Sequence, residues 1–374
     1  MSRPPRLLIV SPIASHPADQ GNAARIQVLG AALMARGITC EFILLATEGL
    51  VPSQQAAMAG FWHALHVEPG VAIGESSLPG CWGLDDWCPP GLAERVAGLH
   101  RARRYDAVLV NYVWLSAAFA GLEGGLRILD THDLFGGRDA LAEAQGIDPS
   151  WFFTTVAEER RGLDRADLVL GIQAEEAAVL RQRCGREVAV LGHMPPLRFL
   201  GPPRPAPAMP FGYLGSANPW NLAAARALDR ALAAEPALPW LLAGRILRRQ
   251  DLTLASRPRL LAQVREAAAF YAQVDCVLNP MAGGTGLKIK TVEALAFGNP
   301  VLGTRDAFAG LPAEHPGHAC ADVAGVVALM REFTASAAFR RELRLASRLL
   351  ALRQAAAVTA QQDALAARLR AAAA

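Results

Sequence analysis

Short runs of consecutive apolar residues alternate with amphipathic segments through most of this 374-residue chain. Runs such as 6–13 and 40–46 are typical of strands that are buried on both faces in a parallel sheet. The segment 23–36, which lies between them, has the length of a helix and is closed by Gly37. Strands that alternate with helices form βαβ units, so the sequence predicts an α/β fold with doubly wound parallel sheets.

The same alternation predicts elements in both halves of the chain. Further strands are predicted at 106–111, 126–130, 168–172, 188–191, 211–215, 240–243, 259–264 and 275–280. Helices are predicted at 152–163, 175–183 and 222–233, and the chain after residue 311 is mostly helical and rich in alanine. Residues 48–100 are rich in proline, glycine and tryptophan, and only a short strand near 61–67 is predicted there.

A proline-rich segment divides the chain into two halves. Residues 195–210 contain seven prolines, namely Pro195, Pro196, Pro202, Pro203, Pro205, Pro207 and Pro210. Such a density of proline is incompatible with the interior of a helix or a central strand, and it makes a semi-rigid linker. The sequence therefore predicts one domain over 1–200 and a second over 201–340, each large enough for its own core.

Composition excludes several classes of protein. The chain is 52% hydrophobic and 19% charged, which is typical of a globular protein, and a net charge of +3 does not indicate nucleic-acid binding. The six cysteines form no Cys-x-x-Cys pair, so reduced thiols in the cytoplasm are expected. The longest apolar stretch, 107–122, contains Asn111, Tyr112 and Ser116 and is too polar to span a membrane.

A glycine-rich loop follows the strand predicted at 275–280 and precedes a helix. Its sequence is Gly283-Gly284-Thr285-Gly286-Leu287-Lys288-Ile289-Lys290. Free backbone N–H groups at the start of a helix suit an anion such as a diphosphate. Lys288 and Lys290 lie where the helix dipole disfavours cations, which also indicates a bound anion. Both could instead be ordinary surface lysines.

Glu293 follows Lys290 by three residues, so the two side chains share a helix face. A carboxylate at this place could accept hydrogen bonds from two vicinal hydroxyls, as on a ribose. Glu293 could also be a simple ion-pair partner of Lys290. With the glycine loop, the first interpretation predicts a site for a nucleotide diphosphate.

Residues 283–301 resemble the donor-binding segment of GT-B glycosyltransferases, in particular those like family 4, the bacterial group 1 glycosyltransferases. The family pattern runs roughly Gly-x-Gly-Leu-Lys-x-Lys-x-x-Glu-Ala-x-Ala-x-Gly-x-Pro-Val. The resemblance implies that the donor is bound by Thr285, Gly286, Leu287, Lys288, Lys290 and Glu293. Many members have a glutamate where this chain has Thr285, so recognition of the donor sugar is left open.

Two other loops resemble loops of the same family. The segment Gly215-Ser216-Ala217-Asn218-Pro219, completed by Asn221, is similar to a Gly-Ser-x-x-Pro-x-Asn loop, which implies phosphate contacts from Gly215, Ser216 and Asn218. It could also be an ordinary N-cap turn. Near the N-terminus, Gly21 occupies a loop that in the family approaches the diphosphate and the acceptor. His16 lies in the same loop, as an acceptor or phosphate contact or as a solvent-exposed side chain.

Polar residues follow the strand predicted at 126–130. At the carboxyl end of a parallel strand such residues face the ligand crevice. The segment Asp130-Thr131-His132-Asp133 resembles the Asp-x-His-Asp loop of the family, which implies a catalytic His132 near the anomeric carbon of the donor sugar. Asp133 either orients His132 or caps the next segment, and Arg138 either contacts an anionic group or pairs with a nearby acid. The segment Glu158-Glu159-Arg160-Arg161 resembles a family helix that faces the cleft, and most of its charges are interpreted as those of a solvated amphipathic helix.

The resemblance implies a GT-B fold, with two facing Rossmann-like domains, an interdomain cleft and C-terminal helices over 341–374 that partly cross back to the first domain. It implies transfer of a sugar from a nucleotide-sugar donor to a hydroxyl of a glycan or lipid-linked acceptor, with retention of configuration, in cell-surface polysaccharide assembly. Domain closure would exclude water. A cytoplasmic location is expected, with peripheral contact at the inner membrane face as an option. No Asp-x-Asp pair occurs, so no metal and no other cofactor are expected.

Other functions remain open at this point. A nucleotide-sugar epimerase or a phosphorylase of the same fold, and a non-catalytic sugar-nucleotide-binding protein, would share most of these motifs. A nicotinamide oxidoreductase is disfavoured because no Gly-x-Gly-x-x-Gly follows the first strand.

Overall fold

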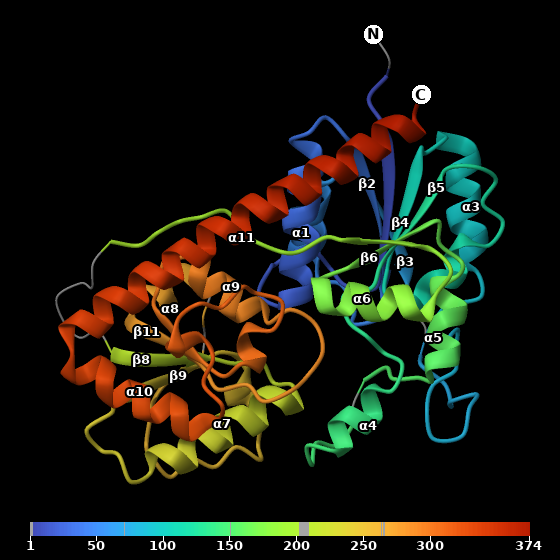
Figure 1. The fold of residues 1–374 in the computed structure, drawn as a ribbon. Helices are drawn as coiled ribbons and strands as arrows, with labels where there is room; N and C mark the ends of the chain where they lie inside the picture. Colours follow the sequence, from blue (N-terminus) through green and yellow to red (C-terminus); the bar gives the residue numbers. More distant parts are fainter. Residues whose placement is uncertain (1–2, 71, 150, 202–208, 263, 265) are drawn as a thin grey trace. The chain divides into compact units, whose positions relative to one another are not determined.

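The structure, a computed structural model, describes residues 3–70, 72–149, 151–201, 209–262, 264 and 266–374. The chain divides into two compact units. Unit 1 comprises Met1–Ala140, Pro149–His193 and Val358–Ala374, and unit 2 comprises Leu141–Asp148 and Met194–Ala357. Each unit is a sheet covered by helices (Figure 1).

Unit 1 contains a seven-stranded parallel sheet in the order β3-β2-β1-β4-β5-β6-β7. The strands are β1 (Arg6–Ser11), β2 (Thr39–Ala46), β3 (Ala64–Pro69), β4 (Ala107–Asn111), β5 (Leu126–Asp130), β6 (Leu168–Gly171) and β7 (Glu187–Val190). The direction of strand order reverses between β1 and β4, which makes this the switch point of the sheet. All five residues of β4 are buried, as its continuous apolar sequence predicts.

Helices and one 3₁₀ segment connect these strands. They are α1 (Gly21–Met34), α2 (Pro52–Phe61), α3 (Leu92–Arg103), η1 (Val113–Phe119), α5 (Val156–Leu163) and α6 (Ala174–Arg183). The short helix α4 (Arg138–Glu143) lies where the chain passes from unit 1 into unit 2.

Unit 2 contains a five-stranded parallel sheet in the order β10-β9-β8-β11-β12. The strands are β8 (Met209–Leu214), β9 (Trp240–Ala243), β10 (Arg259–Leu261), β11 (Val274–Asn279) and β12 (Val301–Gly303). Strand order reverses between β8 and β11, so this sheet also has a switch point. The helices are α7 (Pro219–Leu232), α8 (Ala267–Tyr271), α9 (Ile289–Ala296) and α10 (Val323–Ala335), with 3₁₀ turns η2 (Arg245–Arg248), η3 (Asp306–Phe308) and η4 (Pro316–His318).

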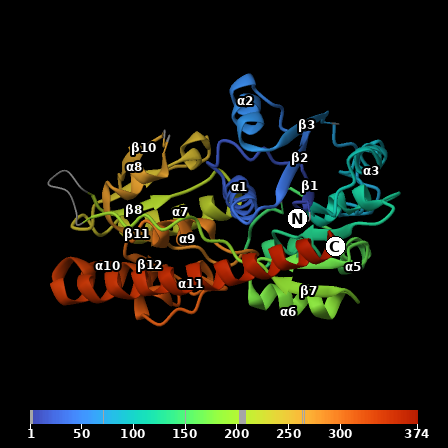
Figure 2. The same cartoon turned by 90° about the horizontal axis from the view of Figure 1, so that it is seen from above.

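The last helix, α11 (Ala337–Ala372), is the long red helix of Figure 1 and Figure 2. Its residues up to Ala357 belong to unit 2, and those from Val358 onward belong to unit 1. Phe339 and Leu343 are part of the apolar core of unit 2. Near the other end, Leu365, Ala366 and Leu369 are part of the core of unit 1. In the described part of the chain, no helix has the length and apolar character needed to cross a membrane.

The prediction of an α/β fold with two doubly wound parallel sheets is confirmed. The region 48–100 was the least predictable: β3 lies close to the strand expected near 61–67, whereas α2 and α3 were not predicted. Only Met58 of α2 is buried, so this helix has no apolar stripe, whereas α3 buries Leu92, Val96 and Leu99 at helical spacing, which was a usable signal.

Two predicted helix starts are wrong because a side chain caps the helix at another residue. The helix predicted from 152 begins at Val156, since the Thr155 hydroxyl accepts the backbone N–H of Glu158. The helix predicted from 222 begins at Pro219, since the Asn218 side chain caps it.

One predicted strand is shorter in the structure, and the predicted linker is described only in part. The strand expected over 259–264 ends at Leu261, where its partner β9 ends at Ala243, and residue 263 of the predicted range lies outside the described residues. Of the proline-rich linker, residues 202–208 lie outside the described residues. In the described part, the N–H groups of Arg198 and Leu200 donate to the carbonyls of Ala296 and Phe297, each over 2.8 Å, so this segment is attached to α9.

Candidate functional site

Three loops of unit 2 leave the carboxyl ends of neighbouring parallel strands. They follow β8, β11 and β12, and the first two flank the switch point of the sheet. In doubly wound sheets, ligands bind in the crevice at such a point. A Cβ atom on Gly284, in the loop after β11, would lie 3.6 Å from the ring of Trp220 at the start of α7. The loops after β8 and β11 are therefore in contact.

The loop after β11 depends on glycine for its conformation. Gly283, Gly284 and Gly286 have φ angles of 69°, 80° and 74°, in the left-handed region that other residues adopt only with strain. The Gly283 N–H donates to a carboxylate oxygen of Asp306 over 2.5 Å. This bond attaches the glycine loop to the loop after β12.

Lys288 stabilises the glycine loop through hydrogen bonds to its carbonyl groups. It is the N-cap residue of α9, and its Nζ atom donates to the carbonyls of Gly284, Thr285 and Gly286 at 3.1, 3.1 and 3.3 Å. In a trans peptide the N–H points opposite to the carbonyl, so the N–H groups of the three following residues point away from the ammonium. A concave row of N–H groups at a helix start is suited to an anion.

The other predicted donor residues of this loop differ in what they can offer. Leu287 is buried, so only its backbone is available to a ligand. The Oγ1 atom of Thr285 is buried and has no hydrogen-bond partner among the residues that the structure describes. A buried hydroxyl without a partner is uncommon, and a ligand or water at this place would satisfy it.

Glu293 lies on the first turns of α9 and is paired. Its Oε2 atom accepts from Lys290 Nζ over 2.8 Å and from the Tyr271 hydroxyl over 2.8 Å. The ion pair that the sequence allowed is therefore present. Both contacts fall on the same oxygen, so the pairing does not occupy the whole carboxylate.

The loop after β8 is built around Asn221. Asn218 accepts the Asn221 N–H over 2.8 Å, so its side-chain oxygen serves as the N-cap of α7. The Asn221 amide nitrogen donates to Ser216 Oγ over 2.6 Å, and its oxygen accepts from Tyr213 over 2.8 Å. Because Ser216 accepts this bond, its own hydroxyl hydrogen is available for an acceptor such as a phosphate oxygen. Gly215 packs against Ile246, and its N–H pairs with the Ala243 carbonyl.

A buried ion pair lies at the switch point of unit 1. Arg25 on α1 donates to both carboxylate oxygens of Asp130 at the end of β5, over 2.9 and 2.7 Å. It also donates to the carbonyls of Leu191 and Gly192 after β7. Burial opposes ionisation of Asp130, but the Arg25 guanidinium and His132 outweigh it and hold the pKa of this carboxyl below its usual range. Arg25 thus joins three segments that are far apart in the sequence.

His132 stands beside this ion pair in a strained backbone conformation, with a φ of 61°. Its Nε2 atom lies 2.6 Å from Asn111 Oδ1 and 3.5 Å from a carboxylate oxygen of Asp130. Its ring stacks on Tyr112, with the ring centroids 4.3 Å apart. These neighbours come from the ends of β4 and β5, which pair through Asn111 and Asp130.

The protonation of His132 follows from these contacts. Burial lowers its pKa to about 4, so the imidazole is neutral near pH 7. The Asn111 amide nitrogen donates to the Val10 carbonyl, which makes Oδ1 the acceptor for a proton on Nε2. In this tautomer Nδ1 carries no proton and can accept a hydrogen bond.

Asp133 and Arg138 lie close to each other. Arg138 Nη1 is 3.6 Å from Asp133 Oδ2, and the guanidinium lies over the Phe135 ring. The hydrogen-bonding neighbours of the His132 ring are Asn111 and Asp130, so the structure does not bring Asp133 to the imidazole in the orienting role that the sequence allowed.

The predicted residues of the first loop have local partners. Gly21 is the first residue of α1, next to the N-cap Gln20. His16 Nδ1 lies 3.0 Å from Ser15 Oγ, and its ring packs on Phe61 with centroids 4.8 Å apart. Half-burial lowers the pKa of His16.

A comparison with protein families identifies the second half of the chain. Residues 211–335 match a family model described as "Glycosyl transferases group 1". The chain carries a group 1 glycosyltransferase domain. No curated protein matches the sequence.

Solved structures with the same fold as this glycosyltransferase cover nearly the whole chain. Sucrose-phosphate synthase from Thermosynechococcus elongatus matches with a TM-score of 0.72 and 18% identity, over 98% of this chain and 100% of that one. HepE from Anabaena, in complex with UDP and glucose, matches with a TM-score of 0.70 and 15% identity, over 98% and 99%. An O-GlcNAc transferase mutant from Thermobaculum terrenum matches with a TM-score of 0.59 and 14% identity, over 100% and 69%. At these identities the matches establish the fold, which confirms the GT-B prediction.

The structure places several residues beside the predicted ones that sequence reasoning missed, either around His132 in unit 1 or around Glu293 in unit 2. They are Arg25, Asn111, Tyr112, His193 and Tyr271. Asn111, Tyr112 and His193 follow the ends of β4 and β7, so their position after a parallel strand was a usable signal. His193 is 2% exposed, and its Nε2 atom has no hydrogen-bond partner among the described residues. Burial lowers its pKa to about 3.

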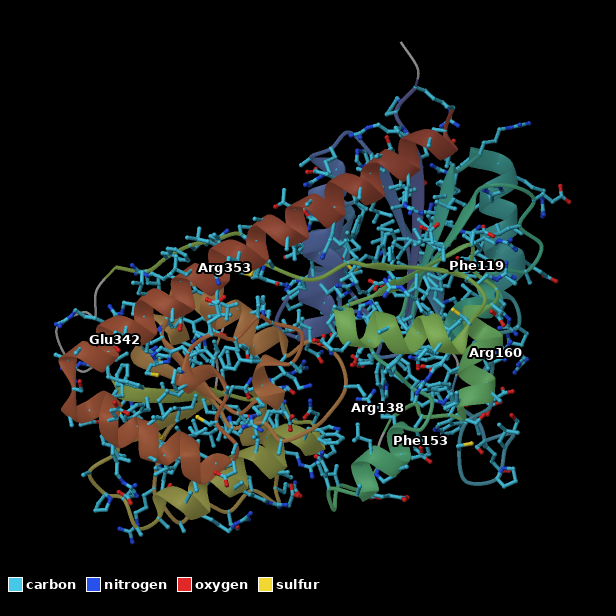
Figure 3. All side chains as sticks on the ribbon, in the orientation of Figure 1. Phe119, Arg138, Phe153, Arg160, Glu342 and Arg353 are labelled. Atoms are coloured by element: carbon cyan, nitrogen blue, oxygen red, sulfur yellow. The ribbon has the colours of Figure 1, made fainter. Side chains whose placement is uncertain are left out.

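Most charges of 158–161 lie on the accessible side of α5, as predicted, and Glu159 is the buried exception. Glu159 is 1% exposed, accepts the Phe135 N–H over 2.7 Å and pairs with Arg183. Arg160 and Arg161 are on the exposed side of α5, and Figure 3 labels Arg160. The helix turns Glu159 toward the loop that carries His132, so it supports that loop.

Proposed function

We propose that this glycosyltransferase uses a nucleotide-sugar donor and that unit 2 binds the nucleoside diphosphate of the donor. The observation that carries the proposal is the glycine loop at the β8/β11 switch point, with Lys288 on its carbonyl side and N–H groups directed away. A diphosphate placed against those N–H groups would meet the start of α9 and the Ser216 hydroxyl. Glu293 would accept hydrogen bonds from the ribose.

The proposed site has to stabilise the negative charge that develops on the departing diphosphate. Backbone N–H groups fixed by the loop, the start of α9 and Lys290 supply positive electrostatic potential there. They need no rearrangement during the reaction, so they stabilise the charge as it develops. These groups would support metal-independent transfer, which is part of the proposal.

In the proposed reaction the acceptor oxygen forms a bond to the anomeric carbon while the bond from that carbon to the diphosphate oxygen breaks. The acceptor hydroxyl proton passes to an oxygen of the departing diphosphate, on the same face of the sugar. Configuration is then retained, and no nucleophile from the protein is required. The contribution of the protein is positioning and stabilisation of the leaving group.

Unit 1 would hold the acceptor and supply His132. A neutral imidazole whose Nε2–H is committed to Asn111 offers Nδ1 as an acceptor for a sugar hydroxyl near the reacting carbon. The acceptor class, a glycan or a lipid-linked hydroxyl in surface polysaccharide assembly, and peripheral membrane association rest on the family resemblance alone.

Known structures support the nucleotide-sugar part of the proposal. The Anabaena HepE structures are described as complexes with UDP, with UDP and glucose, and with UDP-glucose. They share the fold of this chain, and their ligands identify UDP as the first nucleotide to test.

The proposal is tested by a thermal-shift and calorimetric screen against UDP, GDP, ADP and dTDP, followed by turnover of the matching nucleotide sugars with a panel of acceptors. We expect one nucleoside diphosphate to bind preferentially and its release to depend on an acceptor. Interconversion of the sugar without an acceptor, observed by NMR, would identify an epimerase instead. Binding without turnover over the whole panel would identify a non-catalytic protein.

A further inference from the structure

The hydroxyl of Tyr271, at the end of α8, is buried against the carboxylate of Glu293. Tyr271 is 1% exposed, and its hydroxyl donates to Glu293 Oε2 over 2.8 Å. We propose that Tyr271 is a positioning residue, which fixes Glu293 so that its Oε1 atom is presented to the ribose of the donor. The inference rests on the proposed function, because it assigns a role to the ribose site.

Lys290 and Tyr271 together occupy one oxygen of the carboxylate. Both bonds to Oε2 measure 2.8 Å, and the two donors come from different helices. Each carboxylate oxygen has about two acceptor sites, so Oε2 is filled by these donors. The described residues place no donor on Oε1, which keeps its acceptor sites for ligand hydroxyls.

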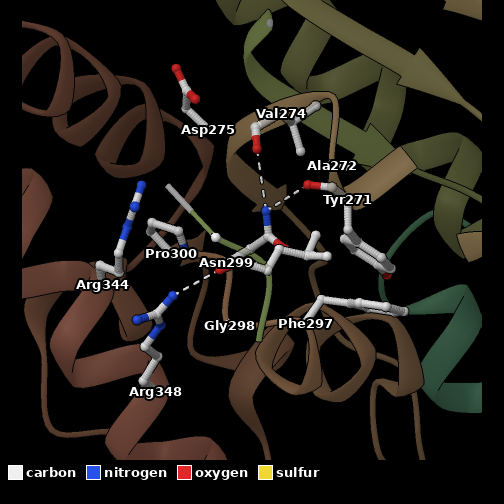
Figure 4. Close-up of a pocket in the computed structure, with 12 residues that line it drawn as sticks. Tyr271, Ala272, Val274, Asp275, Phe297, Gly298, Asn299, Pro300, Arg344 and Arg348 are labelled. Carbon is white, nitrogen blue, oxygen red and sulfur yellow. Dashed lines mark hydrogen bonds between the residues drawn. The ribbon is translucent and has the colours of Figure 1, made fainter. Parts of the chain in front are cut away.

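The Tyr271 ring is held in place independently of Glu293. It stacks on Phe297 with centroids 4.8 Å apart and 24° between the ring planes, and it meets Phe270 edge to face. The side-chain nitrogen of Asn299 donates to the Tyr271 carbonyl over 3.0 Å and to the Val274 carbonyl over 3.2 Å (Figure 4). A rigid donor of this kind can impose an orientation on the side chain that accepts from it.

A cavity borders this part of unit 2. The cavity has a volume of about 220 Å³ and is lined by Tyr271, Phe297, Asn299, Arg344 and Arg348, among others (Figure 4). Tyr271 is nevertheless only 1% exposed, so its ring is closely packed beside the cavity.

The hydroxyl acts as a donor, and the Glu293 carboxylate at 2.8 Å is a closer acceptor than the Lys290 carbonyl at 3.4 Å. Burial raises the pKa of Tyr271 well above its usual value, and the charge of Glu293 raises it further. The phenol therefore stays protonated near pH 7. An unpaired glutamate would sample several rotamers, whereas this one loses that freedom before the donor binds.

The test is Tyr271→Phe, which removes the hydroxyl and keeps the ring. The dissociation constants of UDP, GDP and ADP are measured by calorimetry, together with those of 2′-deoxy-UDP, 2′-deoxy-GDP and 2′-deoxy-ADP. We expect the best ribonucleotide to bind about 5- to 10-fold more weakly, which is less than the loss of a direct bond to a charged group, because Glu293 keeps its contact with Lys290 and loses only part of its fixed orientation. Binding of its 2′-deoxy form should change less, so the preference for ribose should shrink. Unchanged constants for both forms would overturn the proposal.

Tyr105→Phe is a chemically matched control. Tyr105 in unit 1 is 2% exposed and donates to Glu41 Oε2 over 2.7 Å, so the substitution breaks the same kind of buried Tyr–Glu bond. It should lower the melting temperature without changing nucleotide binding. An equal loss of binding in Tyr105→Phe would show that the effect of Tyr271→Phe is one of general stability, and would overturn the assignment.

Two further variants separate the inference from the proposed function. If Tyr271 acts through Glu293, adding Tyr271→Phe to Glu293→Gln should change nucleotide binding no further. If Glu293→Gln alone leaves binding unchanged, the ribose site itself is wrong. If Glu293→Gln weakens binding and Tyr271→Phe does not, only the positioning role fails.

Should Tyr271→Phe not fold, Phe297→Leu provides a second test. It removes the ring on which Tyr271 stacks and should reduce the preference for ribose over 2′-deoxyribose in the same direction. An unchanged preference would count against the positioning role.

Discussion

The Nε2 atom of His132 lies 2.6 Å from the Oδ1 atom of Asn111, at the ends of two paired strands of unit 1. This contact fixes which nitrogen of the ring carries the proton and leaves Nδ1 as an acceptor. We expect His132→Ala to lower turnover by at least about 100-fold, a typical loss for a positioned acid–base or polar catalytic group. The Arg25–Asp130 pair remains in this variant, so the circular dichroism spectrum should be unchanged.

Asn111→Ala tests the tautomer in the same site. Without the Asn111 oxygen, the Nε2 proton of His132 loses its acceptor, and the ring can flip or change tautomer. Turnover should fall while affinity for the nucleoside diphosphate stays at the wild-type level, because Asn111 belongs to unit 1. Wild-type turnover in both variants would remove His132 from the reaction.

Three buried histidines predict how stability depends on pH. Burial lowers the pKa of His132 to about 4, of His193 to about 3 and of His318 to about 4, from an ordinary value near 6.5. Between pH 6.5 and about 4 the unfolded chain binds protons that the folded chain does not. The free energy of unfolding should therefore be constant above pH 6.5 and fall as the pH is lowered through this window, by on the order of 3 kcal/mol per histidine.

The measurement is urea denaturation at pH 7.5, 6.5, 5.5 and 4.5. His318→Gln is a suitable comparison, because His318 contacts Ser347 Oγ through Nε2 over 3.0 Å, which a glutamine amide can also reach. Its stability should decline less steeply below pH 6.5 than that of the wild type. Parallel curves would contradict the assignment of a depressed pKa to His318.

Glu293→Ala should weaken binding of the donor. Loss of a hydrogen bond to a charged group costs about 1.5–3 kcal/mol, or about 10- to 150-fold in the dissociation constant. Calorimetry with the nucleoside diphosphate selected by the screen measures this directly. Glu332→Ala, on the exposed side of α10, is a control that removes a carboxylate of the same unit and should bind as the wild type does.

Arg25→Met should strongly destabilise unit 1. It leaves the Asp130 carboxylate buried without its guanidinium partner, and removal of one member of a buried pair costs about 3–5 kcal/mol. The midpoint of urea denaturation should shift accordingly. Adding Asp130→Asn should recover part of the loss, since the uncompensated charge is then gone. A double variant no more stable than Arg25→Met would show that the cost comes from the lost contacts to the Leu191 and Gly192 carbonyls.

The sequence was sufficient to predict contiguous features. The strands of both sheets could be predicted because their apolar runs are continuous. The glycine loop could be predicted because its glycines, lysines and glutamate follow one another within a few residues. Helix α2 could not be predicted because only its Met58 is buried, whereas α3 buries Leu92, Val96 and Leu99 at the spacing of one helix face and could have been predicted.

The cluster around His132 could be predicted only in part. Its members come from α1 and from the ends of β4, β5 and β7, and no local pattern shows that Arg25 turns inward to Asp130, 105 positions away. The sequence could not show which charge of 158–161 is buried for the same reason, because the partners of Glu159, Phe135 and Arg183, are each 24 positions distant. Tyr271 was missed because an aromatic residue beside a buried strand is read as part of the core, and only the structure shows where its hydroxyl points.

The division of α11 between the units has a consequence for synthesis of the chain. The core of unit 1 includes Leu365, Ala366 and Leu369, and Gln361 accepts the Gly192 N–H over 2.8 Å. The first unit to leave the ribosome is thus the last to be completed, since it needs the final turns of the last helix. Unit 2, which ends at Ala357, has all of its residues before then. A released chain that stops at Ala357 should therefore contain a protease-resistant unit 2 attached to an unfinished, protease-sensitive unit 1.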